Sequence, residues 1–221
     1  MDTLSCMKER KSIRAFLEKP VPHRLLEELM AAARWAPSST NMQPWRVTLV
    51  SGRKKRQLDK LLLESFDRGL EMEIDLETYP DTWQEPYRSR RRECGLSLYR
   101  ALNIGKNDKA KMKSQMRENF RAFGAPVALF LHMDADLKEG SILDCGMFLQ
   151  NVMLAARALG LESCPQASLI QYGGVLRRFL GLAEDQRLLV GLAIGYADYG
   201  HPVNSYRTSR LESDDFVVLL E

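Results

Sequence analysis

The stretch Arg10-Lys11-Ser12-Ile13-Arg14 places three cations and a hydroxyl within five positions, at the end of a predicted helix over residues 3–11. Arginine guanidinium groups and a serine hydroxyl suit a phosphate group, which offers strong hydrogen-bond acceptors and roughly two negative charges. Cations at a helix C-terminus are also favourable without any ligand. A second basic group, Arg207-Thr208-Ser209-Arg210, lies near the other end of the chain. A fold that joins the two segments would complete one phosphate pocket.

A loop rich in small polar side chains separates a predicted helix over 21–36 from a predicted strand over 46–50. It reads Ala36-Pro37-Ser38-Ser39-Thr40-Asn41-Met42-Gln43-Pro44-Trp45. Such side chains can hydrogen-bond a polar heterocycle or a polyol, and they are equally typical of a turn capped by Ser and Asn. The chain contains neither GxGxxG nor GxxxxGK[ST]. Because the Rossmann fingerprint and the P-loop are both absent, any nucleotide has to be held in another way.

The remaining apolar segments predict an α+β domain. Residues 54–70 and 174–180 have helical periodicity, and 142–161 is a helix that is apolar on almost every side, which indicates burial. Residues 125–132 and 187–196 are nearly continuous apolar strands, as expected where both faces of a sheet are covered. This order favours a central mixed sheet flanked by helices. The apolar tail 216–220 is predicted as a strand that pairs with an edge of its own sheet or of a partner subunit's sheet.

The composition is that of an ordinary globular protein. The chain has 221 residues, of which 45% are hydrophobic and 28% charged, and these values suit one domain with a sizeable core. The formal net charge is only +3, and no apolar run is long enough to span a membrane, so we expect a soluble cytoplasmic protein without membrane partners. Four cysteines and three histidines are scattered without metal-site or catalytic-triad spacing. The composition therefore leaves open a protein whose chemistry belongs to a bound cofactor.

Five short motifs give the chain a resemblance to the nitroreductase family of FMN-dependent oxidoreductases. They agree with the family in order and spacing, and they are residues 10–14, 36–45, 124–127, 158–165 and 207–210. The resemblance implies one nitroreductase domain over residues 1–221 with the family's α+β fold. It also implies a homodimer with FMN at the interface and a C-terminal strand exchanged between subunits. Only residues 71–115 are weakly covered, and they resemble the longer insertion of one subgroup.

The resemblance implies cofactor-binding roles for the basic segments at the two ends of the chain. The segments would hold the FMN phosphate and ribityl chain through Arg10, Lys11, Ser12, Arg14, Arg207 and Arg210. The polar loop would reach the flavin of the neighbouring subunit through Pro37, Ser38, Ser39 and Asn41.

Two further elements are assigned by the same resemblance. Asp144 falls where a polar helix residue meets the ribityl chain or the ring edge. Pro165, Gln166 and Ala167 fall where backbone groups line the flavin face and an amide approaches N5. Many family members have Pro-x-Glu-Gly where this chain has Pro165-Gln166-Ala167-Ser168. That difference leaves the hydrogen-bond donor to N5 open.

Residues 71–122 are interpreted as an inserted lid over the flavin. The segment is rich in charge and contains the basic run 88–92, which could attract the phosphates of NADH or NADPH or form a solvated helical face. Aromatic residues in and beside the segment are candidates for walls of a substrate pocket, although core packing is the more common role of such residues. These candidates are Trp83, Tyr87, Phe120 and Phe123.

The implied activity is reduction of nitroaromatics, quinones or similar electron-poor acceptors by a ping-pong hydride mechanism. NADH or NADPH would reduce FMN and leave, and the acceptor would then take its place. Hydride transfer at flavin N5 needs no side-chain nucleophile, so no catalytic side chain is predicted. A specialised branch of the same fold, of the reductive dehalogenase or flavin-destructase type, is the alternative. A basic nucleic-acid-binding module is disfavoured because aromatic residues are not interleaved with the basic clusters.

Overall fold

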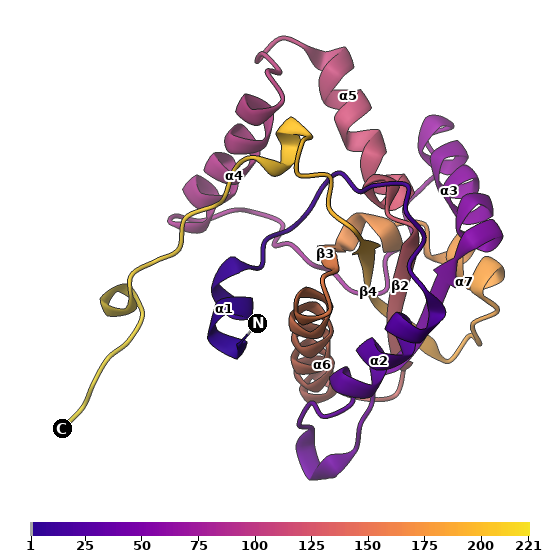
Figure 1. The fold of residues 1–221 in the computed structure, drawn as a ribbon, viewed down its shortest axis with the longest axis vertical. Helices are drawn as coiled ribbons and strands as arrows, with labels where there is room; N and C mark the ends of the chain where they lie inside the picture. The colour runs from indigo at the N-terminus through magenta and orange to yellow at the C-terminus, as the bar shows by residue number, and fades with distance from the viewer. Residues whose placement is uncertain (1) are drawn as a thin grey trace.

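A four-stranded antiparallel sheet forms the centre of the computed structural model, which describes residues 2–221 (Figure 1). The strand order is β1 (Arg46–Ser51), β2 (Val127–Asp134), β4 (Gln186–Gly195) and β3 (Glu162–Gln166). Every neighbouring pair of these strands is antiparallel, which corrects the mixed sheet expected from the sequence. Apolar runs report burial on both faces but carry no information on strand direction. The α+β class itself is confirmed.

Helices cover both faces of the sheet and produce two hydrophobic clusters. Along β2, Ala128 and Phe130 belong to one cluster, whereas Leu129 and Leu131 belong to the other. Successive side chains of a strand point to opposite faces, so a nearly continuous apolar sequence supplies both clusters at once. One cluster is completed by α3 (Gly52–Asp67) and α7 (Gly173–Leu180), and the other by α2 (His23–Ala33) and α6 (Glu139–Ala158).

The segment that follows α3, called the excursion below, contributes little to these clusters. It contains α4 (Tyr87–Ala101) and α5 (Lys109–Arg117), and neither helix has a buried residue. The two helices form an arch that stands away from the sheet in Figure 1. The chain returns to the core through the 3-10 segment η2 (Glu118–Gly124), and an ion pair at 2.8 Å between Arg117 and Asp67 ties α5 to α3.

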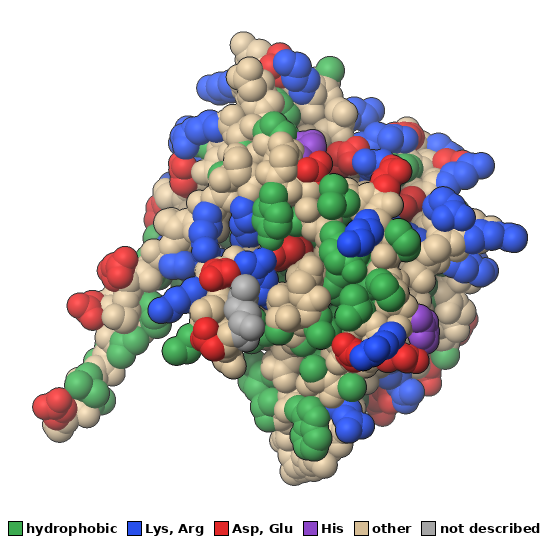
Figure 2. All heavy atoms as spheres, viewed as in Figure 1, with side chains coloured by type: hydrophobic (Ala, Val, Ile, Leu, Met, Phe, Trp, Pro, Cys, Tyr) green, Lys and Arg blue, Asp and Glu red, His purple; other side chains and the backbone are tan. Residues whose placement is uncertain are grey.

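The C-terminal tail forms no strand within one chain. After the 3-10 turn η5 (Ser213–Asp215), residues 217–221 have no regular secondary structure and project from the body (Figures 1 and 2). The side chains of Val218 and Leu220 are 83% and 89% exposed. The predicted strand over 216–220 is therefore not formed within the chain, because the preceding linker leads the tail away from the sheet and leaves its backbone without a pairing partner.

None of the helices in residues 2–221 is long and apolar enough to cross a bilayer.

Candidate functional site

The first basic segment lies along the edge strand β3. Helix α1 (Thr3–Glu9) ends before Arg10, so residues 10–14 are extended rather than helical. Ser12 forms a parallel bridge with Ser163 of β3, and the backbone N–H of Ile13 donates to the Ser163 carbonyl at 3.1 Å. The side chain of Ile13 is fully buried. Because neighbours in an extended segment point to opposite sides, Ser12 and Arg14 face away from the core.

Folding brings the two basic ends of the chain together at Arg10. The pKa of Arg10 is lowered, first by burial and then by the positive charges of Arg210 and Arg207. The Nε atom of Arg10 is buried and has no hydrogen-bond partner among residues 2–221. Basic side chains gather on this face, between α1 and the descending C-terminal segment (Figure 2). A buried, unsatisfied cationic donor beside two further cations is the arrangement that an anion would stabilise.

The other two cations of the segment already have partners within the chain. The Lys11 ammonium donates to the carbonyl of Asn204 and lies 5.8 Å from the ring centre of Tyr199. The backbone N–H of Arg14 donates to the Asn204 side chain at 2.8 Å, and its guanidinium donates to the hydroxyl of Tyr206 at 3.1 Å. Asn204 thus fixes the segment, although no sequence motif marks it as a site residue.

A cavity of about 570 Å³ lies beside this segment and contains several of the predicted site residues. Arg14 lines it together with Pro165, Gln166 and Ala167, at the point where β3 passes into the 3-10 turn η3 (Ala167–Ile170). Phe120 and Phe123 also line it.

The aromatic candidates therefore separate into two groups. Phe120 and Phe123 are only 3% and 4% exposed, so they are core residues that also form a wall of the cavity. Trp83 and Tyr87 do not line the cavity. Tyr79, which the sequence did not single out, lines it instead, and its ring packs against Trp83 with the ring centres 5.7 Å apart. Tyr87 begins α4 and is exposed.

Three polar side chains form a connected group at the cavity. Gln166 donates through Nε2 to the carbonyl of Asn119 at 3.2 Å, and the Ser168 hydroxyl donates to Asn119 Oδ1 at 3.2 Å. The Oε1 atom of Gln166 is buried and has no partner in the described chain. Buried acceptors are normally satisfied, so this oxygen can accept from an N–H or O–H of a bound ligand. No sequence motif marks Asn119, because η2 brings it to β3 only through the tertiary fold.

The polar loop over 36–45 is not part of this cavity. Asp144, in the early part of α6, accepts the backbone N–H of Ser39, and the Ser38 hydroxyl accepts the backbone N–H of Gln43 at 2.9 Å. Asp144 is 4% exposed, so it braces the loop from within. Neither Pro37 nor Asn41 lines the cavity.

The basic cluster lies near the opposite end of α6. Arg157 is thirteen residues beyond Asp144, which corresponds to about 20 Å along the helix axis. Its guanidinium pairs with Glu162 at the start of β3 and with Glu9, next to Arg10, at 2.7 Å. The two halves of the predicted cofactor site are therefore far apart within one chain.

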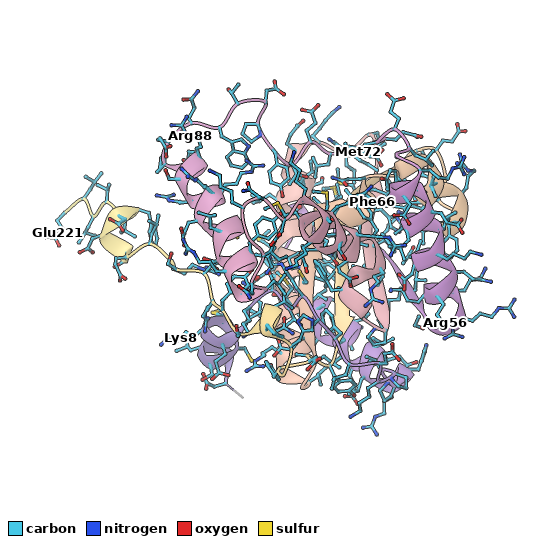
Figure 3. All side chains as sticks on the ribbon, turned by 90° about the horizontal axis from the view of Figure 1, so that it is seen from above. Lys8, Arg56, Phe66, Met72, Arg88 and Glu221 are labelled. Atoms are coloured by element: carbon cyan, nitrogen blue, oxygen red, sulfur yellow. The ribbon has the colours of Figure 1, made fainter. Side chains whose placement is uncertain are left out.

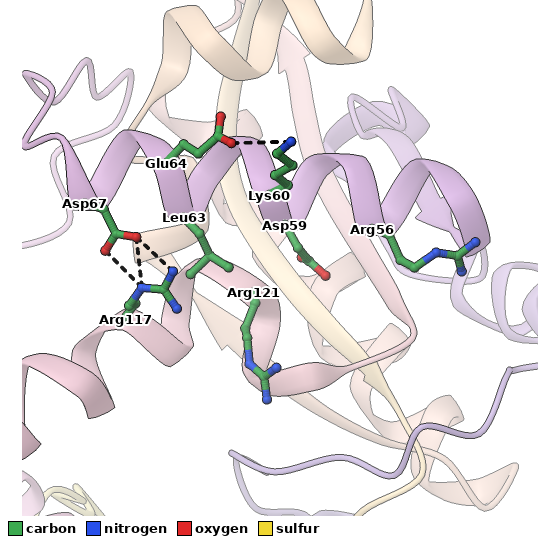
Figure 4. A pocket seen from close by; sticks show the side chains of 8 residues that line it. All are labelled: Arg56, Asp59, Lys60, Leu63, Glu64, Asp67, Arg117 and Arg121. Carbon is green, nitrogen blue, oxygen red and sulfur yellow. Dashed lines mark hydrogen bonds and ion pairs between the residues drawn. The ribbon is translucent and has the colours of Figure 1, made fainter.

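A second cavity, of about 400 Å³, lies between α3 and η2 and has a different character (Figure 4). Its charged side chains pair largely with one another, as Lys60 does with Glu64 at 3.7 Å and Arg117 with Asp67 at 2.8 Å. None of the buried side-chain atoms that lack a partner in residues 2–221 belongs to it. The cavity beside Arg14 is therefore the better candidate for a ligand site.

Comparisons with known proteins agree with the fold. The model of the nitroreductase family matches residues 7–196. The chain is 38% identical to a 4-nitrobenzoate reductase of Pseudomonas putida over 208 residues, which cover 94% of this chain and 90% of the relative. It superposes with a TM-score of 0.96 on the FMN and NADPH-dependent nitroreductase NfnB of Sphigopyxis sp. strain HMH, with 37% identity and full coverage of both chains.

A further solved structure is the FMN-dependent nitroreductase NfnB of Mycobacterium smegmatis in complex with NADPH. It superposes with a TM-score of 0.94 at 31% identity and covers 99% of this chain and 97% of that one. The match extends through the excursion, which the sequence motifs covered only weakly. The chain belongs to the nitroreductase family.

Proposed function

We propose that the protein is an FMN-dependent oxidoreductase that uses NADH or NADPH to reduce nitroaromatics, quinones or similar electron-poor acceptors by a ping-pong mechanism. The observation that carries the proposal is the cationic cluster of Arg10, Arg207 and Arg210, in which the buried Nε of Arg10 has no hydrogen-bond partner among residues 2–221. The cluster lies beside the segment that lines the larger cavity. The 4-nitrobenzoate reductase and the FMN-dependent NfnB enzymes support it as similar proteins.

The residues fit FMN in their chemistry. The buried Nε of Arg10 and the nearby Arg210 and Arg207 would hold the phosphate, since charge-assisted hydrogen bonds to phosphate are strong. The unpartnered Oε1 of Gln166 would accept a hydrogen bond from a polar edge of the ring system. Bound FMN would supply hydride acceptance and donation at N5.

The chain's own contribution is binding, orientation and exclusion of water. Arg14 lines the cavity with its guanidinium held by Tyr206, so its charge is available to favour a reduced, anionic ring. Phe120 and Phe123 present an apolar wall that excludes water from one side of the cavity. No side-chain nucleophile is needed, which agrees with the scarcity of histidine and paired cysteine in the sequence.

The working unit in this proposal is a homodimer. One chain places the loop 36–45 far from its own basic cluster, so a complete site needs the loop of a second copy. Exposed apolar side chains near the loop suit such an interface, with Trp35 77% and Leu143 70% exposed. The tail 216–220 pairs with no strand within residues 2–221 and would pair with the second subunit. The four free cysteines favour a reducing compartment, and we place the protein in the cytoplasm.

The test is flavin content followed by turnover. Purified protein is expected to be yellow and to release an equimolar amount of FMN on denaturation. Anaerobic NADH or NADPH should bleach the flavin, and 4-nitrobenzoate or a quinone should restore its colour. The proposal would be refuted if the protein stays colourless and does not quench the fluorescence of added FMN. A flavoprotein that neither nucleotide reduces would refute the assigned reductant.

A further inference from the structure

We propose that Glu73 and Asp75, seated against Gly173 and Gly174, are positioning residues that set the width of the larger cavity and thereby the size of acceptor it admits. The inference rests on the proposed function, because it assumes that the acceptor enters this cavity. It assigns a specificity role to the first residues of the excursion, which follow α3.

The wall that this segment provides has little packing of its own. Leu70, Met72 and Tyr79 line the cavity, yet Met72 and Tyr79 are 56% and 64% exposed. Met72 and Phe66, whose labels lie close together in the upper half of Figure 3, both line the same cavity. Side chains that are mostly exposed cannot fix the backbone that carries them. The position of the wall must therefore come from contacts of the adjacent residues.

The first such contact is a close approach of two backbones at Glu73. Its N–H donates to the Gln171 carbonyl at 2.8 Å, and its carbonyl accepts the Gly173 N–H at 3.0 Å. A Cβ atom on Gly173 would lie 2.5 Å from the Glu73 carbonyl oxygen, which is too close for any side chain. At Gly174 a Cβ atom would meet only the Glu73 carboxylate, the mobile end of a side chain. Gly173 is thus the position that lets the segment approach α7.

The second contact is the carboxylate of Asp75. It accepts the backbone N–H of Leu188 in β4 at 2.7 Å and pairs with Arg177 of α7. The Asp75 carbonyl accepts from the Arg187 side chain at 3.0 Å. The segment is therefore joined to both the sheet and α7 within three residues of Met72. If the contacts of Asp75 with Leu188 and Arg177 are displaced, Met72 in the cavity wall moves with them.

The test replaces Gly173 with alanine and compares acceptors of two sizes. Gly173→Ala should push the Glu73 backbone outward, which draws Met72 away from the opposite wall. Nitrobenzene and 1-nitronaphthalene differ by one fused ring and serve as the small and large acceptor. The ratio of kcat/KM for the large acceptor to kcat/KM for the small one is expected to rise at least about threefold. This is a modest change, since one methylene group in a hydrophobic pocket changes kcat/KM by roughly tenfold or more. Gly95→Ala in α4 is the matched control, since its Cβ would meet nothing within 4 Å.

A second variant keeps the inference testable if Gly173→Ala fails to fold. Asp75→Ala removes the joint to Leu188 and Arg177 without adding an atom, and the same change in the acceptor ratio is expected. FMN content and the far-UV circular dichroism spectrum should match the wild type in both variants, which separates a change of specificity from general loss of structure. An unchanged acceptor ratio in a folded, FMN-loaded variant of either kind would overturn the inference. Absence of FMN or of NAD(P)H oxidation in the wild type would instead refute the proposed function.

Discussion

The carboxylate of Asp144 in α6 accepts the backbone N–H of Ser39, with both carboxylate oxygens 3.2 Å from that nitrogen. This bond fixes a loop in which Thr40, Asn41 and Gln43 all have positive φ angles of 49° to 58°. Such conformations are costly for residues other than glycine and persist only where the surroundings enforce them. Asp144 is the buried group that enforces this one.

Replacing Asp144 with alanine should therefore loosen the loop. We expect Asp144→Ala to lower the free energy of unfolding by about 1–3 kcal/mol, because the Ser39 N–H loses its partner. In the proposed homodimer it should also weaken FMN retention, because the loop completes the partner's site. Chemical denaturation and released FMN measure the two effects. The exposed Asp136→Asn is the control, and equal stability of the two variants would contradict the bracing role.

Arg10→Ala should weaken FMN binding without unfolding the protein. Loss of a charge-assisted hydrogen bond costs about 1.5–3 kcal/mol, which corresponds to about a 10- to 100-fold rise in the FMN dissociation constant. Flavin fluorescence quenching measures this constant. Arg88→Ala is the control, because its side chain is 66% exposed and pairs with Glu85 on the surface. Equal FMN affinity in both variants would remove Arg10 from the phosphate site.

His132 should make the FMN-free protein sensitive to acid. The pKa of His132 is lowered, first by burial and then by the charge of Arg46. The unfolded chain therefore binds the proton more tightly, so stability is fully present above the ordinary pKa of about 6.5 and is lost as the pH falls through the folded pKa. Urea denaturation at pH 7.5 and 5.5 should show that the free energy of unfolding falls less between these two pH values in His132→Phe than in the wild type. An equal loss would assign the acid sensitivity to other groups.

Removal of the tail should weaken the proposed dimer. Truncation after Leu211 deletes the projecting apolar side chains, including Phe216 and Leu219, which are 67% and 75% exposed in one chain. Burial of each such side chain contributes about 1.5–3 kcal/mol, so the dimer dissociation constant should rise at least tenfold. Sedimentation equilibrium measures it. Identical association of the truncated and full-length chains would show that the tail has no role in assembly.

Local patterns in the sequence were sufficient for most of the fold. The continuous burial of β2 and the largely apolar surface of α6 are recorded in the residues themselves, and both elements form as expected. The strand β3 was not recognised, because Glu162-Ser163-Cys164-Pro165-Gln166 has no strand-like alternation and is stabilised by pairing with β4. The tail has the composition of a strand but no edge to join, since strand formation depends on a partner.

The candidate site was predicted where a motif carries chemistry and missed where tertiary contacts place a residue. Arg10 and Arg210 stand out in the sequence by their charge and by the family resemblance, and folding brings them together. Asn119 and Asn204 belong to no motif, and each gains its place from hydrogen bonds with a distant segment. Tyr79 also belongs to no motif, and its ring packs against the nearby Trp83. Trp83 was expected at the cavity, but Tyr79 lines it instead, and residue type alone could not distinguish the two.

The separation of the loop 36–45 from Arg10 along α6 has a genetic consequence. In the proposed homodimer each site would take Arg10 from one chain and Asn41 from the other, so two differently damaged chains could restore each other. A chain carrying Arg10→Ala and another carrying Asn41→Ala would each be defective alone. Mixed together, they form dimers in which both lesions fall in the same site and the second site is intact. Co-expression should therefore recover activity that neither variant has alone. This intragenic complementation follows from the length of α6, which separates the two halves of the site within one chain.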